Sequence, residues 1–326
     1  MLELTRLKVF CEVASHGSFT KAAEVLGYAQ PSVSHHIAQL ERELGAQLFE
    51  RQPRRLQLTD AGQVFLDYAR PVLVQLADAQ REVTETVRSG GGTLRLAAFP
   101  TAAATLMPAA AGAFRASRPN VDLSLTEADP PVAVPGLIAG DCDLAIVYDY
   151  PALGAAPDPA VELEPLFGDQ MTVVVPASHR LAGRAALRLE ELARERWITP
   201  HDSMCRDALL LACRTAGFTP DAVSMTNDYM AMQGLVAAGV GVALMPRLAV
   251  AIARRPGVVM IPLERPVIER VTFIATRFGA YKSPATDAFR AALRAAVPAA
   301  EDARLPLEAY DPEHAVAPQP GGRRDA

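Results

Sequence analysis

The chain has 326 residues, half of them apolar, and a formal net charge of −5 at neutral pH. This length exceeds what one hydrophobic core usually organises, so we expect several domains. No apolar span is long enough for a membrane helix, and the amino terminus resembles an amphipathic helix more than a secretion signal. We therefore expect a cytoplasmic protein with no membrane partner.

Residues 17–45 predict two short helices separated by a tight turn. Ser18 is placed to cap the first helix, whose apolar residues recur at helical spacing up to Leu26, and Gly27 ends it. The second helix begins at Gln30–Pro31, because proline is tolerated at a first helical position. The residues expected to be buried on it are Val33, Ile37, Leu40 and Leu44.

The opposite face of the second helix carries hydrogen-bonding side chains, whereas Lys and Glu dominate an ordinary solvated face. These outward residues are Ser32, His35, Gln39 and Arg42. A hairpin follows, with its turn at Gln52–Pro53. It carries three guanidinium groups suited to phosphates, those of Arg51, Arg54 and Arg55.

The segments 17–23, 30–34, 48–51 and 58–62 resemble the amino-terminal signature of the LysR-type transcriptional regulators. The resemblance implies that residues 1–58 form a winged helix-turn-helix domain that binds double-stranded DNA. Positions matching the family's contacts are Gln30, Pro31, Ser34, His35 and the three wing arginines. We add Ser18, Thr20, Ser32, Gln39 and Arg42 as candidate DNA contacts.

Two residues depart from the family pattern. Ala29 stands where Ser or Thr is common, so we expect the recognition helix to lack a side-chain cap. His35 stands where Arg is common, which predicts a weaker and more pH-sensitive contact with the base.

Residues 59–89 predict a long helix that dimerises the protein. Thr59 is placed to cap it, and its apolar residues recur about every 3.5 positions, which suits packing against a partner helix. They are Phe65, Tyr68, Val72, Leu76, Ala79, Val83 and Thr86 or Val87. The resemblance implies the same dimerising role and adds a tetramer of two dimers. Paired DNA-binding domains would then contact an interrupted inverted repeat.

Three glycines, residues 90–92, predict a hinge, after which residues 93–298 alternate short strands and helices. Strands are expected at about 94–99, 121–127, 143–147, 171–175, 242–245, 258–262 and 271–276. Helices are expected at about 102–117, 131–139, 205–217, 229–238 and 284–297. This alternation predicts an α/β domain with mostly parallel sheets.

The segments 140–146 and 235–246 are similar to landmarks of the LysR effector domain. The resemblance implies a two-lobed α/β domain like that of periplasmic binding proteins. Lobe I would comprise about 93–168 and 267–298, and lobe II about 169–266. Residues 299–326 are rich in Pro, Ala, Gly and charge, which predicts a disordered tail.

A small-molecule effector should bind where the strands of the two lobes end. For each candidate residue the alternative is a capping or turn role. The candidates at strand exits are Thr101, Ala102, Asp129, Tyr148, Thr199, His201, Ser203 and Asn227.

One alternative is a redox-responsive regulator that uses Cys205 and Cys213. The resemblance to the peroxide-sensing branch of the family places a disulfide pair near these positions, with Cys205 offset by one residue. However, eight residues along one helix separate the α-carbons by about 12 Å, which is beyond the roughly 7 Å limit for a disulfide.

Two other protein classes remain as alternatives. A solute-binding protein of a transport system shares the two-lobed architecture, but it would need a secretion signal and no DNA-binding domain. An enzyme is disfavoured, because the chain has no P-loop, G-x-S-x-G, H-E-x-x-H or C-x-x-C motif. A cysteine hydrolase using Cys205 and His201 has no identifiable orienting partner. We expect no cofactor and no metal.

Overall fold

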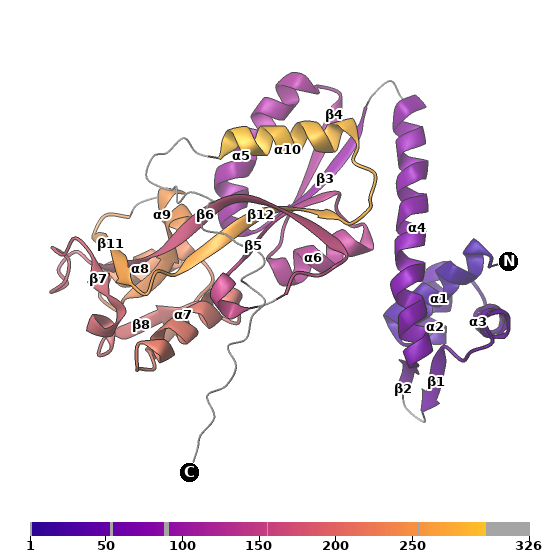
Figure 1. Cartoon of the computed structure of the whole chain (residues 1–326), viewed down its shortest axis with the longest axis horizontal. Coiled ribbons are helices and arrows are strands. Elements are labelled where there is room, and N and C mark those ends of the chain that lie inside the picture. The colour runs from indigo at the N-terminus through magenta and orange to yellow at the C-terminus, as the bar shows by residue number, and fades with distance from the viewer. Residues whose placement is uncertain (1, 53–54, 88–90, 155, 253–254, 298–326) are drawn as a thin grey trace, which may run out of the picture. The chain divides into compact units, whose positions relative to one another are not determined.

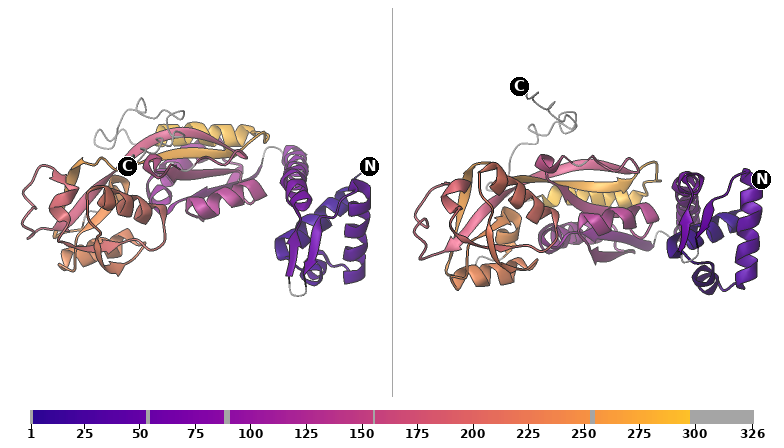
Figure 2. Two further views of the ribbon diagram at one scale, coloured as in Figure 1. Left: turned by 60° about the horizontal axis from the view of Figure 1, so that its bottom comes forward. Right: turned by 90° about the horizontal axis from the view of Figure 1, so that it is seen from below.

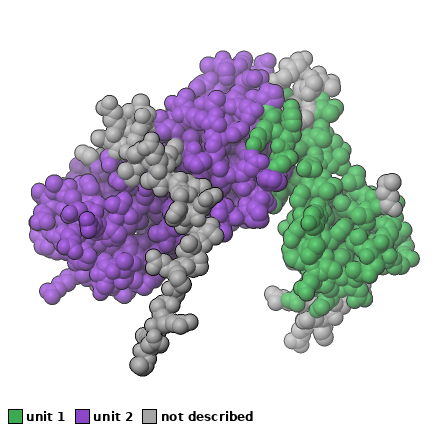
Figure 3. Space-filling view, in the orientation of Figure 1, with its two compact units in different colours: residues 1–92, 138–141, 279–283 green, residues 93–137, 142–278, 284–326 purple. Residues whose placement is uncertain are grey.

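The computed structural model describes residues 2–52, 55–87, 91–154, 156–252 and 255–297. The chain divides into two compact units (Figure 3). One contains residues 1–92 with 138–141 and 279–283, and the other contains the rest of the chain. Across the described residues, we find no helix long and apolar enough to cross a membrane.

The first unit begins with a helix-turn-helix, formed by α1 (Leu4–His16), α2 (Phe19–Leu26) and α3 (Gln30–Leu44) (Figures 1 and 2). As predicted, the Ser18 hydroxyl accepts a hydrogen bond from the Lys21 amide at 3.3 Å, and Gly27 ends α2 with φ of 68°. Also as predicted, Ala29 provides no side-chain cap for α3.

The core of this unit is built from apolar residues of all three helices and the hairpin. Val33, Ile37 and Leu40 are buried, as predicted, but Leu44 is 37% exposed. The prediction for Leu44 was wrong because α3 ends there, at Gly45, and the core is closed instead by Leu48 and Phe49 of the following segment.

The predicted hairpin forms from β1 (Phe49–Gln52) and β2 (Arg55–Leu58), which pair antiparallel. Its tip, Pro53 and Arg54, lies outside the described residues. Helix α4 (Asp60–Val87) follows, and the Thr59 hydroxyl accepts from the Gly62 amide at 2.9 Å, which confirms the predicted cap.

After α4 the chain forms β3 (Gly92–Ala98), α5 (Pro100–Ser117), β4 (Val121–Glu127), α6 (Pro130–Ala139) and β5 (Leu144–Asp149). After a short 3-10 turn (Pro151–Leu153) comes the long strand β6 (Val161–Pro176). Gly92 is therefore the first residue of a strand and not part of a hinge, because glycine adopts extended backbone as readily as turns.

The chain continues through β7 (Leu187–Arg188), a 3-10 turn (Leu189–Leu192), β8 (Arg196–Thr199), α7 (Met204–Thr215), β9 (Asp221–Met225) and α8 (Tyr229–Ala237). It then forms β10 (Ala243–Pro246), α9 (Arg247–Ile252), β11 (Val258–Arg265), β12 (Glu269–Arg277) and α10 (Pro284–Ala296). The sequence missed β7, β8, β9, α9 and the first half of β6.

The main sheet has eight strands in the order β4-β3-β5-β12-β6-β11-β7, with β10 also pairing with β6. The expectation of mostly parallel sheets was wrong. Although β3 and β5 are parallel, β12 is antiparallel to both β5 and β6, and β6 is antiparallel to β10 and β11. The reason is that β12 returns beside β6 in the opposite direction (Figure 1), and β6 continues past it to pair with β10 and β11.

Each lobe covers its part of this sheet with helices. Helices α5 and α10 pack together in lobe I, where the Phe114 and Phe289 rings lie 5.4 Å apart. Helices α7, α8 and α9 surround the strands of lobe II, including a parallel pair, β8 and β9 (Figure 1). The two lobes thus share one sheet, and helices α5, α7 and α8 begin near the point where it passes from one lobe to the other.

Candidate functional site

The outward side of α3, which we call the reading face, is accessible to solvent. It consists of Gln30, Pro31, Ser32, Ser34, His35, Gln39 and Arg42, of which Ser34 and Gln39 are half-buried and the others exposed. Gln30 Nε2 donates to Ser34 Oγ at 3.0 Å, and Arg42 Nε donates to the Ala38 carbonyl at 3.3 Å. The polar side chains of this face therefore point away from the hydrophobic core and are accessible to a binding partner.

Two candidate contacts lie at the start of α2. Thr20 is exposed, whereas Ser18 is half-buried and uses its hydroxyl as the helix cap. Ser18 therefore serves the local fold, and Thr20 is the more accessible of these two candidates.

The Glu41 side chain of α3 holds the start of the hairpin in place. Glu41 Oε1 accepts from the Leu48 amide at 2.8 Å and from the Phe49 amide at 3.3 Å. A β-carbon at Gly62 would overlap the Leu48 carbonyl, so glycine is needed where α4 approaches the hairpin. Arg51 and Arg55 lie on β1 and β2, but their side chains, like all of Arg54, lie outside the described residues.

The second unit contains a pocket, here called the effector pocket, of about 380 Å³ including its opening to solvent. Five predicted effector residues line it, namely Thr101, Asp129, Tyr148, Ser203 and Asn227. They come from the first turn of α5, the residue before α6, strand β5 and the loops before α7 and α8. The rule that ligands gather at strand exits therefore located the pocket.

Three predicted effector residues do not line this pocket. Ala102 is wholly buried in the hydrophobic core, because its side chain points into lobe I and away from the cavity. Thr199 is 1% exposed in β8, and His201 is exposed outside the lining. The His201 amide instead donates to Asn227 Oδ1 at 2.7 Å, which connects the two loops of lobe II.

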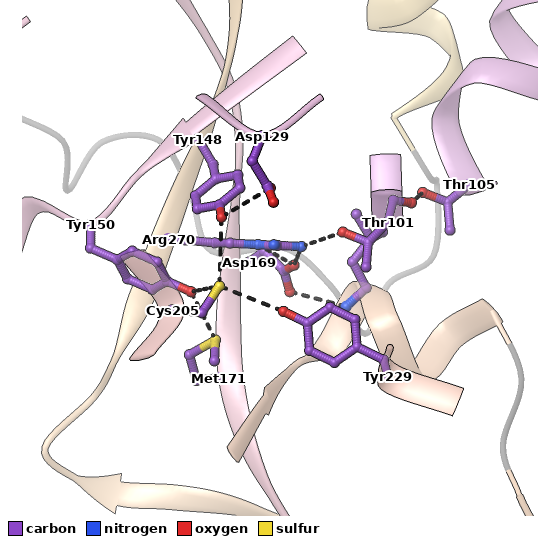
Figure 4. A network of polar contacts seen from close by, with 11 residues as sticks. Thr101, Thr105, Asp129, Tyr148, Tyr150, Asp169, Met171, Cys205, Tyr229 and Arg270 are labelled. Carbon is purple, nitrogen blue, oxygen red and sulfur yellow. Dashed lines mark hydrogen bonds and ion pairs between the residues drawn. The ribbon is translucent and has the colours of Figure 1, made fainter. Parts of the chain in front are cut away.

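Arg270 of β12 lies at the base of the pocket and was not foreseen from the sequence (Figure 4). Its side chain is buried, and Nε and Nη2 donate to Asp169 Oδ2 at 3.0 and 2.8 Å. Nη2 also donates to Thr101 Oγ1 at 2.8 Å, and the guanidinium lies over the Phe99 and Tyr148 rings, 4.8 and 5.1 Å from their centroids. Burial acts to lower the pKa of Arg270, but Asp169 together with Tyr150, Tyr229 and Cys205 outweighs it, so the pKa is raised.

Cys205, in the first turn of α7, is surrounded by three phenols (Figure 4). The Tyr150 hydroxyl donates to its sulfur at 3.2 Å, the sulfur donates to the Tyr148 hydroxyl at 3.7 Å, and the Tyr229 hydroxyl lies at 3.5 Å. Burial and the neighbouring Cys205 raise the pKa of all three tyrosines, so they stay protonated and can donate hydrogen bonds.

Cys205 and Cys213 do not form a disulfide. They lie eight residues apart on the uninterrupted helix α7, and both are buried, as are Cys11 and Cys142. Burial raises the pKa of Cys213 to about 12, which keeps this thiol protonated and unreactive at neutral pH. The described part of the chain also contains no group of three or more His, Cys, Asp or Glu residues arranged to hold a metal ion.

Six lining residues were missed by the sequence analysis: Phe99, Pro100, Pro200, Cys205, Tyr229 and Arg270. Most of these residues lie within two positions of a predicted one. They could have been found by including the neighbours of each candidate up to the first turn of the following helix. Arg270 needed a different signal, which is a charged residue near the start of a buried strand.

Comparison with known proteins assigns both units to one family. Residues 4–63 match the profile of the bacterial regulatory helix-turn-helix protein, lysR family, and residues 88–298 match that of the LysR substrate binding domain. The transcriptional dual regulator GltC of Bacillus subtilis is 30% identical over 277 residues, which cover 84% of this chain and 90% of GltC.

Solved structures agree with this assignment. A full-length OxyR variant from Pseudomonas aeruginosa superimposes with a TM-score of 0.61 at 26% identity, covering 91% of this chain and 94% of that one. Full-length CbnR in complex with its target DNA gives a TM-score of 0.52 at 25% identity, covering 90% and 99%. This chain therefore belongs to the LysR family of DNA-binding transcriptional regulators, with a helix-turn-helix domain and a two-lobed effector-binding domain.

Proposed function

We propose that this regulator binds an interrupted inverted repeat in duplex DNA through the reading face and the β1–β2 wing, and that a small molecule in the effector pocket alters this binding. The observation that carries the proposal is the exposed row of hydrogen-bonding side chains on α3, beside a hairpin fixed by Glu41. Side chains such as Gln30 and His35 have the size and polarity to meet base edges in the major groove.

Dimerisation through α4 would place two reading faces on the two half-sites. The predicted apolar row on this helix is exposed in the single chain, with Tyr68 74%, Val72 45%, Leu76 39% and Val83 65% accessible. Side chains of this kind at 3-4 spacing are normally covered by a partner helix. Phe65 instead packs against the helix-turn-helix core, and the side chains of Thr86 and Val87 lie outside the described residues. A tetramer of two such dimers follows from the family.

The proposed effector control rests on the fact that residues of both lobes line the pocket. Thr101 and Arg270 belong to lobe I, whereas Ser203 and Asn227 belong to lobe II. A molecule that contacts both lobes stabilises the arrangement in which both walls reach it, and so shifts the population toward that arrangement. In this proposal the pocket binds its ligand without converting it, and the protein acts in the cytoplasm.

Gln30→Ala tests the proposed reading face. Operator affinity of the full chain would be measured by fluorescence anisotropy on the intergenic DNA beside its own gene. Losing one good base contact costs about 1–3 kcal/mol, so we expect roughly 5- to 150-fold weaker binding. The matched control is Asn120→Ala, which removes an exposed amide from the effector domain and should leave affinity unchanged. Equal affinities for wild type and Gln30→Ala, or equal losses in both variants, would contradict the proposal.

A further inference from the structure

We propose that the effector carries a protonated amine that binds the Asp129 carboxylate, and an oxygen atom that accepts a hydrogen bond from Arg270. This inference rests on the proposed role of the effector pocket and specifies the chemistry of its ligand. It follows from the charges that line the pocket and from the hydrogen bonds that they already make.

The charge lining the pocket is negative in balance. Two of its lining residues are charged, Asp129 and Arg270. Asp169 neutralises Arg270 through two contacts of 2.8 and 3.0 Å. Within the described residues, Asp129 pairs with no Lys or Arg, and its carboxylate accepts a single hydrogen bond, from the Tyr148 hydroxyl at 3.3 Å. The one charge that a ligand would meet uncompensated is therefore a carboxylate.

One loop beside the pocket adds to this negative charge. Asp202, which precedes the lining residue Ser203, is neutralised by its ion pair with Arg206 at 3.2 Å. Asp228 lies between Asn227 and Tyr229 and accepts the Met230 amide at 2.8 Å. Clefts lined by one sign of charge concentrate ligands of the opposite sign, so the pocket favours cations over simple anions.

The base of the pocket offers a hydrogen-bond donor to a ligand. Nε and Nη2 of Arg270 are satisfied by Asp169 and Thr101, whereas Nη1 has no acceptor among the described residues. The side chain is 1% exposed and lines the cavity, so only a group inside the pocket can accept from Nη1. Water or an oxygen of the ligand can fill that position, and a ligand oxygen there gains a hydrogen bond from a charged donor, which is the stronger kind.

The aromatic ring near Asp129 suits an amine at that end. Tyr148 lines the cavity beside Asp129, to which its hydroxyl donates, and aromatic rings attract ammonium groups. Figure 4 shows Asp129 and Tyr148 on one side of the Arg270 guanidinium and Thr101 on another, so the amine and the oxygen would occupy different parts of the pocket. The oxygen can belong to a carboxylate, as in an amino acid, or to a hydroxyl, as in an amino alcohol.

Matched pairs of small molecules, in which a hydroxyl replaces the amine, test this assignment. Thermal unfolding of the full chain, followed by Trp197 fluorescence, would be titrated with ethanolamine against ethylene glycol, L-alanine against L-lactate, and L-phenylalanine against L-phenyllactate. We expect at least one amine to bind roughly tenfold or more tightly than its hydroxyl partner, because hydrogen bonds between charged groups are the stronger ones. The amino acid and amino alcohol arms show which oxygen Arg270 prefers.

Two variants locate the effect. Asp129→Asn should abolish the preference for the amine, whereas Asp122→Asn, which removes an exposed carboxylate from β4 of the same lobe, should retain it. Binding by the hydroxyl partners alone, binding by none of the amines, or a preference that persists in Asp129→Asn would overturn the assignment. Operator binding without added ligand, measured on the same samples, tests the proposed function separately.

Discussion

Replacing Asp169 by Asn should destabilise the effector domain strongly, because it leaves the Arg270 charge buried without its counter-ion. The two side chains are 2% and 1% exposed, and arginine cannot release its proton in a protein. Removing one partner of a buried ion pair costs about 3–5 kcal/mol.

The expected loss lies at the lower end of that range, about 3 kcal/mol. Asparagine keeps an oxygen that can accept from Arg270 Nε or from the Leu248 amide, which now donates to Asp169 at 3.1 Å. The Phe99 and Tyr148 rings still face the guanidinium, and a desolvated cation–π contact contributes about 2 kcal/mol. Removing the charge as well, in Asp169→Asn with Arg270→Met, should be less costly than Asp169→Asn alone.

Urea unfolding followed by tryptophan fluorescence measures these differences. Trp197 is the single tryptophan and is wholly buried in β8, so the signal reports the effector domain. Asp287→Asn is the control, because Asp287 is 59% exposed and its ion pair with Arg290 should contribute less than about 1 kcal/mol. The reasoning is refuted if Asp169→Asn costs no more than this control, or if the double variant is less stable than the single one.

Three further predictions concern other parts of the chain. His35→Arg should tighten operator binding about fivefold or more, because arginine can donate two hydrogen bonds to one base; unchanged anisotropy titrations would contradict this. Burial acts to raise the pKa of Glu164, but the hydrogen bonds and charges of Arg290 and Arg294 outweigh it and lower the pKa. Its stabilising effect is therefore present above the unfolded pKa of about 4.3 and is lost as pH falls through the folded pKa. Glu164→Gln should then be less stable than wild type in urea at pH 7, and the gap should close in acid; a gap that is independent of pH argues against it. Cys213, whose pKa is raised to about 12 by burial, should remain a free thiol after peroxide treatment, and a disulfide found by thiol titration would disprove this.

The helix-turn-helix could be predicted from the sequence because its determinants are local. The cap at Ser18, the break at Gly27 and the start of α3 at Gln30 each depend on neighbours within one helical turn. The exception, Leu44, depended on which later segment closes the core, and helical spacing carries no information about that.

The effector pocket was predicted only in part, because its chemistry depends on distant pairs. Thr101 and Asp129 were found from a general rule about strand exits. Arg270 pairs with Asp169 across 101 positions and with Thr101 across 169, and no local pattern indicates such a contact. The antiparallel course of β6 and β12 was missed for the same reason.

The order of the strands has a consequence for how the protein forms during synthesis. Lobe I needs β12 to complete its sheet, and it needs α10, whose Phe289 packs on Phe114, to cover α5. Both segments are translated after the whole of lobe II. On the ribosome, lobe II therefore has all its strands available first, while β5 waits with an unpaired edge for residues 269–277. A nascent chain that stalls before that point exposes this edge to chaperones or to aggregation.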